Sequence, residues 1–204
     1  MKQTTFAEAY RVAKPRTLLS ETRCRALWLL GGLTEGIPGD VLELGSYKGG
    51  SLFLLAAACP TRQVYGIDTY AGMPDMASAG IDGRKAGEFG DTSFISVRHF
   101  VASLPNARPI SMKFPEGMAN LRHLDQGDPF LGLGGPFSMA HFDGDLYSSC
   151  VAFLDFVLPR LSPGGAIVFD DYRWEKCPGV QKAIEERGLE VVWAMANQAV
   201  YVKR

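Results

Sequence analysis

The sequence predicts a single-domain α/β protein with a mostly parallel β-sheet, helices on both faces of the sheet and an antiparallel hairpin at the C-terminal end. Short apolar segments alternate with helical segments along most of the chain, an order that builds parallel strands through right-handed crossovers. Glycines and prolines stand between these segments. The length of 204 residues fits one domain, and no repeat, low-complexity tract or linker divides residues 1–204.

The composition is typical of a globular protein and excludes several classes. Apolar residues make up 47% of the chain and charged residues 21%, as in most folded domains. The 21 basic and 22 acidic residues leave a net charge of −1, which argues against a nucleic-acid-binding protein. The apolar run 52–59 ends at Pro60 and is far shorter than the roughly 20 residues of a membrane-spanning helix. We therefore expect neither nucleic acid nor a membrane as a partner.

The cysteines indicate a reducing compartment. Cys24, Cys59, Cys150 and Cys177 form no C-x-x-C pair, and no apolar segment typical of a secretory signal follows Met1. A chain of this length can build its core without disulfides. We expect free thiols in a cytoplasmic protein.

Two helices are predicted before the first strand. Apolar residues recur at helical spacing over 6–13, and Pro15 closes that helix. Ser20 is the expected N-cap of a second helix that ends at Gly31–Gly32. We expect residues 1–36 to cover the functional site.

A βαβ unit follows these helices. Residues 41–45 form a short apolar strand, Gly49–Gly50 open a helix over 51–59, and 64–68 form the next strand. The order of strand, glycine turn, helix and strand is typical of a parallel sheet.

The 23 glycines of the chain gather in particular segments. Residues 72–93 hold five of them with little periodicity, and a segment of that length is typical of a lid or substrate loop. A helix over about 92–103 and a weak strand over 110–114 lead to a second loop, 127–135.

The second half of the chain continues the alternation and ends in a hairpin. Its elements are a strand over 137–143, a helix over 147–158, a strand over 166–170 and a helix from Pro178 to Gly188. Strands over 190–194 and 199–203 then follow each other without a helix between them, which predicts an antiparallel pair.

The loop 43–50 indicates a bound nucleoside. Gly45 lets the backbone approach a ligand, and Gly49–Gly50 leave the N–H groups of the next helix free for an anion. Asp68 ends the following strand. In nucleotide-binding βαβ units, an acid at this position holds the ribose hydroxyls. Tyr47 stands where a dinucleotide motif has its second glycine, so we expect a smaller tail than a pyrophosphate, such as an amino-acid carboxylate. Ordinary turn glycines and a solvent-facing acid are the alternative.

Two pairs of acids also end strands. Asp143 and Asp145 follow one strand, and Asp170 and Asp171 follow another, so we expect both pairs at the same edge of the sheet. Neighbouring carboxylates repel one another unless a cation compensates them, and hard oxygen ligands suit Mg²⁺. The alternative is that Asp145 caps a helix and Asp171 holds a turn. His141 shares a face with Asp143, either beneath the site or as a core histidine.

Several of these stretches resemble known methyltransferases. Residues 41–51 resemble motif I of class I S-adenosylmethionine-dependent methyltransferases, including, more distantly, the catechol O-methyltransferase type. The stretches 143–147, 159–165 and 170–172 resemble the macrocin and mycinamicin O-methyltransferase family, which methylates sugar hydroxyls of macrolide antibiotics. The resemblance covers about 38–187 and implies a Rossmann-like methyltransferase fold.

The resemblance and the loop pattern together suggest a set of site residues. The expected contacts of S-adenosylmethionine are Glu43, Gly45, Ser46, Tyr47, Gly49, Asp68, Thr69 and Asp143. The expected ligands of Mg²⁺ are Asp143, Asp170 and Asp171. Catechol enzymes place a lysine base three residues after the first of these acids, where this chain has Leu146. We therefore expect Asp143 nearest the reacting hydroxyl, with Asp145 or His141 as proton acceptor.

The expected function is an S-adenosylmethionine- and Mg²⁺-dependent O-methyltransferase. Its partner would be a small hydroxylated natural product, such as an antibiotic, with the acceptor on a sugar, vicinal diol or phenol. The N-terminal segment is short for the macrolide-sugar enzymes, which leaves the acceptor open.

Three other functions remain open from the sequence. A metal-dependent nucleotide-sugar glycosyltransferase would explain Asp143 and Asp145 but not the loop 43–50. A cephalosporin-hydroxylase-like relative and a module that binds the cofactor without turnover are the others. Apolar surface on the closing hairpin and the N-terminal helices would indicate a homo-oligomer.

Overall fold

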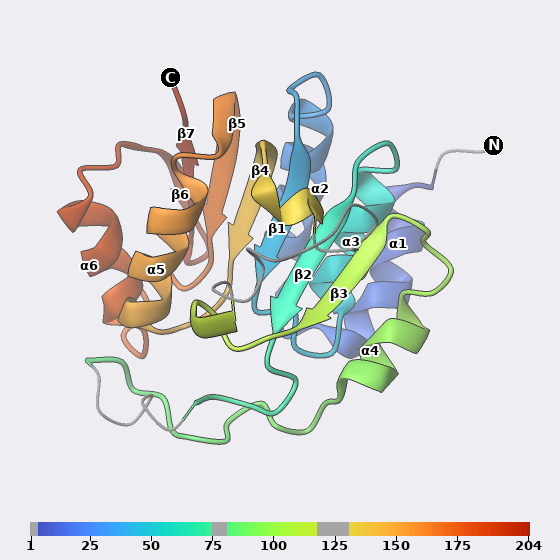
Figure 1. Cartoon of the computed structure of the whole chain (residues 1–204), viewed down its shortest axis with the longest axis horizontal. Coiled ribbons are helices and arrows are strands. Elements are labelled where there is room, and N and C mark those ends of the chain that lie inside the picture. Colours follow the sequence, from blue (N-terminus) through green and yellow to red (C-terminus); the bar gives the residue numbers. More distant parts are fainter. Residues whose placement is uncertain (1–3, 75–80, 118–130) are drawn as a thin grey trace.

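The computed structural model describes residues 4–74, 81–117 and 131–204. At its centre is a seven-stranded sheet in the order β3-β2-β1-β4-β5-β7-β6 (Figure 1). The strands are β1 (Asp40–Leu44), β2 (Val64–Asp68), β3 (Ala107–Ser111), β4 (Phe137–Phe142), β5 (Leu161–Phe169), β6 (Val191–Met195) and β7 (Gln198–Val202). The first five strands pair in parallel, whereas β7 is antiparallel to β5 and β6. The predicted sheet and its closing hairpin are confirmed.

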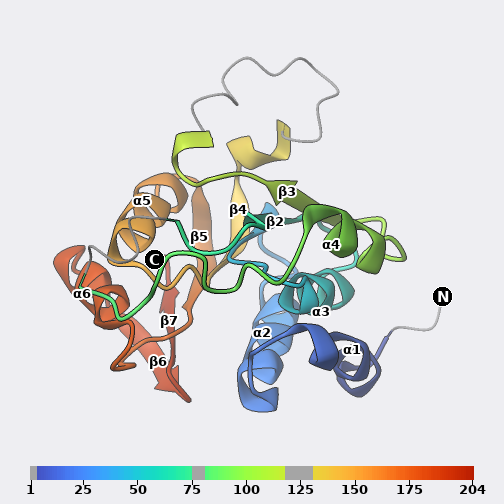
Figure 2. The ribbon, with the colours of Figure 1, turned by 90° about the horizontal axis from the view of Figure 1, so that it is seen from below.

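Helices cover both faces of the sheet (Figure 2). They are α1 (Phe6–Ala13), α2 (Glu21–Leu33), α3 (Gly50–Ala58), α4 (Phe94–Phe100), α5 (Tyr147–Val157) and α6 (Pro178–Glu186), with the short 3-10 turns η1 (Lys14–Arg16) and η4 (Leu131–Gly134). One apolar core joins α5 and α6 to one face, and a second joins α1 to α4 to the other. The prediction of helices on both faces is confirmed.

Hydroxyl side chains begin the first two helices, and the cap at Ser20 is the one that the sequence predicts. Thr5 and Glu8 form a reciprocal capping box at the start of α1. The Ser20 side chain accepts a hydrogen bond from the backbone N–H of Arg23 at the start of α2. The predicted stop of α2 at Gly31–Gly32 is wrong, because the helix continues to Leu33. A Cβ on Gly31 would lie 2.9 Å from the Cys59 sulfur, so this glycine serves the packing of α2 against α3.

Three predicted boundaries also shift. The helix expected over 92–103 is the shorter α4, and the strand expected over 110–114 begins three residues earlier as β3. There Arg108 and Pro109 interrupt the apolar pattern, which an edge strand tolerates. The strand expected over 166–170 begins at Leu161. The loops expected over 72–93 and 127–135 lie partly outside the described residues.

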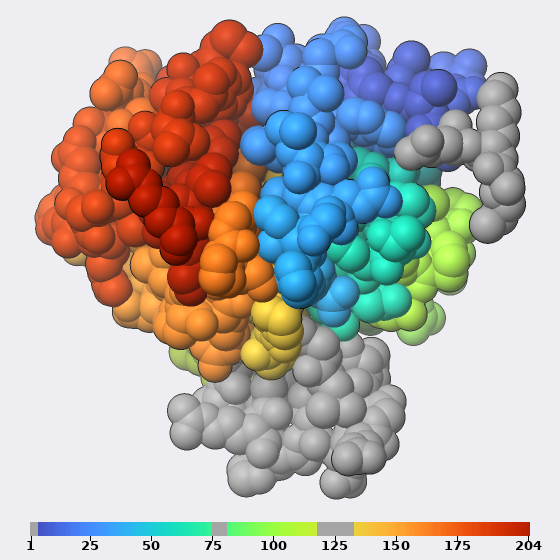
Figure 3. All heavy atoms as spheres, turned by 90° about the horizontal axis from the view of Figure 1, so that it is seen from above, coloured from blue at the N-terminus to red at the C-terminus, as the bar shows by residue number. Residues whose placement is uncertain are grey.

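The two ends of the sheet differ. At the end away from the strands' carboxyl termini, the Ser162 hydroxyl donates to the carbonyl of Pro38, and the segment before β1 lies beside β5 (Figure 3).

Long apolar side chains are exposed on α2 and β6, namely Leu29, Leu33, Val192, Trp193 and Met195. The homo-oligomer expected from the sequence stays a prediction. All four cysteines are buried and free of disulfides. None of the described helices is long and apolar enough to cross a membrane.

Candidate functional site

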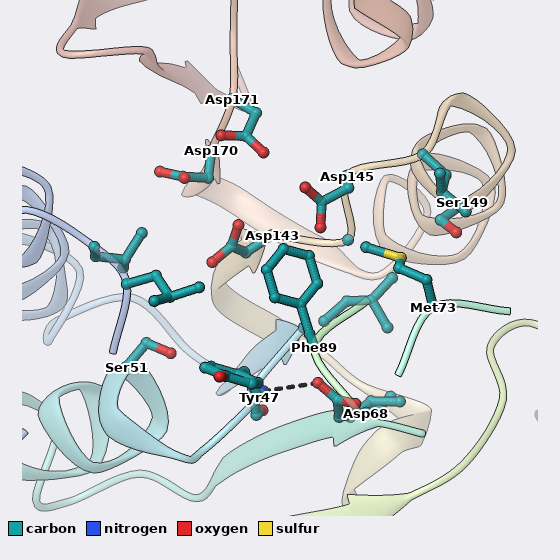
Figure 4. Close-up of a pocket in the computed structure, with 18 of the residues that line it drawn as sticks. Tyr47, Ser51, Asp68, Met73, Phe89, Asp143, Asp145, Ser149, Asp170 and Asp171 are labelled. Carbon is teal, nitrogen blue, oxygen red and sulfur yellow. Dashed lines mark hydrogen bonds between the residues drawn. The ribbon is translucent and has the colours of Figure 1, made fainter. Parts of the chain in front are cut away.

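A cavity of about 650 Å³ lies at the carboxyl ends of the parallel strands. Its walls come from segments far apart in the chain, which the sheet topology brings to one edge. The segments that contribute lining residues are 16–23, 44–51, 67–74, 84–89, 112–114, 143–149, 170–174 and 196–197. Figure 4 shows four aspartates on one side of this cavity and Tyr47 with Asp68 on the other.

The glycine loop after β1 is built by close approach of the chain to itself. Gly45 has a φ of +96°, and a Cβ there would overlap the carbonyl oxygen of Asp143. Gly49 also has a positive φ, of +86°. A Cβ on Gly50 would lie 2.6 Å from the backbone of Arg16. These glycines are therefore required by the packing of the chain, whatever the cavity holds.

Asp68 lies between this loop and the turn after β2. Its Oδ2 accepts the backbone N–H of Tyr47 at 2.7 Å, and its Oδ1 accepts that of Tyr70 at 2.8 Å (Figure 4). Burial raises the pKa of the Asp68 carboxyl, and these two N–H groups oppose the rise. Asp68 and the neighbouring Thr69 both line the cavity.

Glu43 and His141 lie beneath the cavity rather than at its surface. Both side chains are fully buried, and Nδ1 of His141 lies 3.0 Å from Oε1 of Glu43. The Ser46 hydroxyl donates to the other Glu43 oxygen at 2.8 Å. Neither Glu43 nor His141 lines the cavity, whereas Gly45, Ser46 and Tyr47 do. The sequence placed His141 either beneath the site or in the core; it is fully buried, bonded to Glu43 and absent from the cavity lining, as a core histidine is.

The two acid pairs converge at the ends of β4 and β5, as predicted. Oxygens of Asp143, Asp170 and Asp171 lie within 4.8 Å of one another. Burial raises the pKa of Asp143 well above its ordinary range, and Asp170, Asp171 and Asp145 raise it further. Burial raises the pKa of Asp170 to about 6 despite the opposing effect of Arg23. Burial and the neighbouring Asp171 raise the pKa of Asp145 to about 7, although Arg84 acts to lower it.

This oxygen set fits a divalent cation. Oδ1 of Asp170 is buried and has no hydrogen-bond partner in the described part of the chain. An unpartnered buried oxygen is costly unless a cation or water satisfies it. Carboxylate oxygens are the ligands that Mg²⁺ prefers. The predicted ligands Asp143, Asp170 and Asp171 are thus brought together with the right chemistry.

Two arginines that sequence reasoning missed enter the acid cluster. Nη1 of Arg23 lies 2.6 Å from Oδ2 of Asp170 and 3.5 Å from Oδ1 of Asp171. Arg84 pairs with Asp145, and its Nη2 lies 3.7 Å from Asp171. No local pattern places either arginine, although carboxylates so close together imply compensating cations. The two arginines leave Asp143 without a cationic partner among the described residues.

Asp145 does not cap α5, so that alternative is wrong. The N-cap position of α5 is Leu146, which makes no side-chain cap. The backbone N–H of Tyr147 donates instead to Asp82 at 2.7 Å. The Asp145 carboxylate turns to the cavity, where the thiol of Cys177 donates to its Oδ1 at 3.4 Å. Cys177 is a further site residue that the sequence did not indicate.

Comparison with protein families identifies the fold and its relatives. Residues 42–172 match the model of a methyltransferase domain. This chain belongs to the methyltransferase domain family. The match runs from β1 to the second acid pair, and so includes the loop after β1 and the four aspartates. Membership confirms the class I methyltransferase resemblance seen in the sequence.

Curated relatives of this chain include O-methyltransferases of Streptomyces and Micromonospora. The 8-demethyl-8-(2,3-dimethoxy-alpha-L-rhamnosyl)-tetracenomycin-C 4'-O-methyltransferase of Streptomyces olivaceus is 28% identical over 155 residues, which are 71% of this chain and 57% of the relative. The mycinamicin III 3''-O-methyltransferase of Micromonospora griseorubida is 26% identical over 182 residues, which are 84% of this chain and 71% of the relative. The chain thus spans less than two thirds of the first relative's length.

Solved structures of methyltransferases share the fold. The O-methyltransferase NovP superposes with a TM-score of 0.73 at 21% identity, over 92% of this chain and 82% of NovP. The O-methyltransferase from Bacillus cereus in complex with SAH gives a TM-score of 0.61 at 15% identity, over 100% of this chain and 92% of that one. The Rossmann-like methyltransferase fold expected from the sequence is confirmed.

Proposed function

We propose that this chain is an S-adenosylmethionine- and Mg²⁺-dependent O-methyltransferase that acts on a hydroxyl group of a small natural product. The acceptor hydroxyl belongs to a sugar, a vicinal diol or a phenol. The observation that carries the proposal is the convergence of Asp143, Asp170 and Asp171 on a cavity whose other side holds the glycine loop and Asp68. One cavity thus offers a nucleoside site and a cation site side by side.

The cofactor half of the cavity is formed by the ends of β1 and β2. In the proposal, Asp68 accepts hydrogen bonds from the ribose hydroxyls, with Thr69 beside it. Gly45, Ser46 and Tyr47 border the amino-acid end, since all three line the cavity. Glu43 and Gly49 lie behind this surface, and we propose that they hold the loop in shape for the cofactor.

The acceptor half is formed by the aspartates. Asp143, Asp170 and Asp171 would hold Mg²⁺, whose positive charge lowers the pKa of a nearby hydroxyl and gathers acceptor oxygens. Asp143 links the glycine loop to the acid cluster. Its backbone carbonyl lies against Gly45, and its carboxylate lies beside those of Asp170 and Asp171. We assign proton acceptance to Asp145 rather than His141, because Asp145 lines the cavity and His141 does not.

The proposed reaction is a displacement at the methyl carbon. The bond between that carbon and the sulfonium sulfur breaks, a bond to the acceptor oxygen forms, and the hydroxyl proton passes to Asp145. What the chain supplies is largely positioning of the two reactants in one enclosed space. The relatives named above support a glycosylated antibiotic as acceptor class, since their names describe methylation of such compounds.

Mass spectrometry tests this proposal directly. The purified chain is incubated with S-adenosylmethionine, Mg²⁺ and a panel of rhamnosides, other vicinal diols and catechols. We expect one or more acceptors to gain the mass of one CH₂ unit, with loss of the product in Asp143→Asn and in excess EDTA. Glu190→Gln, an exposed change far along the chain, is the matched control.

A thermal-shift experiment separates the proposal from its alternatives. Stabilisation by S-adenosylmethionine is expected, because a ligand that binds the folded state raises the melting temperature. Stabilisation by UDP-sugars instead would favour a glycosyltransferase. Binding of S-adenosylmethionine with no product from any acceptor, with or without Mg²⁺, would favour a module without turnover.

A further inference from the structure

The segment 81–92 crosses the open side of the cavity and touches both of its halves. In Figure 1 it passes below the carboxyl ends of the strands, from the side of α6 to the start of α4. Arg84 and Phe89 of this segment line the cavity. The segment is therefore a wall of the proposed active site, and its attachments decide how firmly Arg84 is held.

The first attachment is Asp82, which joins three elements. Its buried carboxylate accepts the backbone N–H of Tyr147 at 2.7 Å and that of Gly179 at 2.8 Å. These N–H groups belong to the first turns of α5 and α6, whose dipoles favour a negative charge there. The N–H of Gly83 also donates to the carbonyl of Lys176 at 2.7 Å. The chain directly before Arg84 is thus fixed to the scaffold.

The second attachment is Asp91, which binds the glycine loop. The hydroxyl of Tyr47 donates to Oδ1 of Asp91 at 2.6 Å, and the ammonium of Lys48 pairs with Oδ2. The hydroxyl of Thr92 donates to the carbonyl of Tyr47 at 3.0 Å. The ring of Phe89 meets the ring of Tyr47 edge to face at 5.7 Å. The far end of the segment is thus tied to the proposed cofactor side.

Arg84 is held between these attachments by aromatic rings and acids. Its guanidinium carbon lies 5.1 Å from the centre of the Phe89 ring and 4.8 Å from that of Trp174. Its side chain is only 10% exposed. Burial of a guanidinium is costly unless a carboxylate and aromatic faces compensate it. This arginine is therefore held by several independent contacts.

The contacts of Arg84 select one oxygen of Asp145. Nε of Arg84 donates to Oδ1 of Asp145 at 2.7 Å, and Nη2 binds the same oxygen. The Cys177 thiol donates to Oδ1 as well. Oδ2 takes part in none of these three bonds, and the carboxyl group of Asp171 is a close neighbour of Asp145. Asp145 also has a φ of +59°, a strained conformation that the surrounding bonds must maintain.

We propose that Arg84 is a positioning residue of the methyl transfer, which holds Oδ1 of Asp145 and so fixes the orientation of this carboxylate in the cavity. The inference rests on the proposed function. A planar guanidinium with two donors can fix the rotation of a carboxylate, which an ammonium or a neutral side chain cannot do as well. Arg84 acts through Asp145 and does not itself touch the reacting atoms.

Steady-state kinetics with an acceptor that the mass-spectrometry panel yields test this role. The variants are Arg84→Met, which removes the charge and the fork, and Arg84→Lys, which keeps the charge. Arg98→Met, an exposed arginine on α4, is the control. We expect Arg84→Met to lower kcat roughly 10- to 100-fold, the effect of a misplaced catalytic group. The acceptor KM and the Kd for S-adenosylmethionine should change less than about twofold, with partial recovery of kcat in Arg84→Lys.

A double-mutant cycle with Asp145→Asn distinguishes positioning from general support of the fold. If Arg84 acts through Asp145, Arg84→Met has no further effect on kcat in the Asp145→Asn background. Equal losses in both backgrounds overturn the inference. A kcat of Arg84→Met within about twofold of the wild-type value also overturns the inference. If Arg84→Met fails to fold, the kcat of Arg84→Lys and a double-mutant cycle of Arg84→Lys with Asp145→Asn test the inference instead. A wild-type chain that methylates no acceptor overturns the proposed function, and this inference with it.

Discussion

The backbone carbonyl oxygen of Asp143 lies in the space that a side chain on Gly45 would fill. The backbone N–H of Asp143 donates to the carbonyl of Leu44 at 2.8 Å, and that of Gly45 donates to Ile67 at 2.8 Å. The ends of β1, β2 and β4 are thus locked together at one point. The proposed cofactor loop and the first acid of the cluster cannot move independently.

This contact predicts that Gly45→Ala is severely destabilising. Overlap with the backbone at Asp143 and a positive φ each cost roughly 1–3 kcal/mol. We expect the free energy of unfolding to fall by about 2–5 kcal/mol, measured by urea denaturation. Gly36→Ala is the control, because a Cβ at Gly36 meets nothing within 4 Å. Equal stability of the two variants would show that Gly45 is not constrained as described.

The raised pKa of Asp68 predicts a pH-dependent cofactor affinity. Burial disfavours the ionised Asp68 carboxyl, whereas hydrogen bonds from ribose hydroxyls favour it. Lowering the pH protonates Asp68 and should weaken S-adenosylmethionine binding, starting above the ordinary carboxyl range near 4. Calorimetry from about pH 7 to about pH 5 measures the Kd. Asp68→Asn should bind weakly with a flatter profile; a wild-type Kd that stays constant over this range would contradict the assignment.

Removal of one acid from the cluster should stabilise the metal-free chain. The pKa of Asp143 is raised by burial and by its acidic neighbours, so its ionised form is unfavourable in the fold at neutral pH. We expect Asp143→Asn in EDTA to raise Tm by about 2–4 °C, which corresponds to about 1 kcal/mol in a chain of this size. Asp155→Asn, a substitution of an exposed residue on α5, is the control and should not raise Tm. A lower Tm for Asp143→Asn would mean that the carboxylate makes a stabilising contact.

Arg23 is expected to weaken cation binding at the cluster. Its guanidinium neutralises Asp170 and approaches Asp171. Arg23→Met should tighten Mn²⁺ or Mg²⁺ binding by about tenfold, because one positive charge a few ångströms away is removed. Isothermal titration gives the affinity, and Arg25→Met is the control, since Arg25 pairs with Glu21 at the surface. Unchanged affinity in Arg23→Met would show that the arginine and the cation use different oxygens.

The sheet and the acid cluster could be predicted because both follow from local patterns plus one topological rule. Asp143 and Asp170 each follow an apolar strand, and the carboxyl ends of parallel strands share an edge. The hairpin followed from two strands without a helix between them. No knowledge of long-range contacts was needed for these features.

The compensating residues could not be predicted, since they come from segments that no local pattern places. Arg84 meets Asp145 across 61 positions of sequence, and Arg23 meets Asp170 across 147. The N–H group of α5 that Asp145 would have capped under the alternative interpretation is bonded by Asp82, 65 positions before Tyr147. The helix stop predicted at Gly31 is wrong because the packing partner of this glycine, Cys59, belongs to the chain after α3, which the local pattern around Gly31 does not place.

The fixed ends of the segment between Asp82 and Asp91 have a consequence for protein engineering. Both aspartates bind the scaffold rather than the cavity interior, whereas Arg84 and Phe89 between them face it. An exchange of this segment must therefore retain Arg84 and Phe89 as well as both anchors, because Arg84 pairs with Asp145 and Phe89 packs on Tyr47. The remaining positions between the anchors can be varied while these contacts to the acid cluster and the glycine loop are kept.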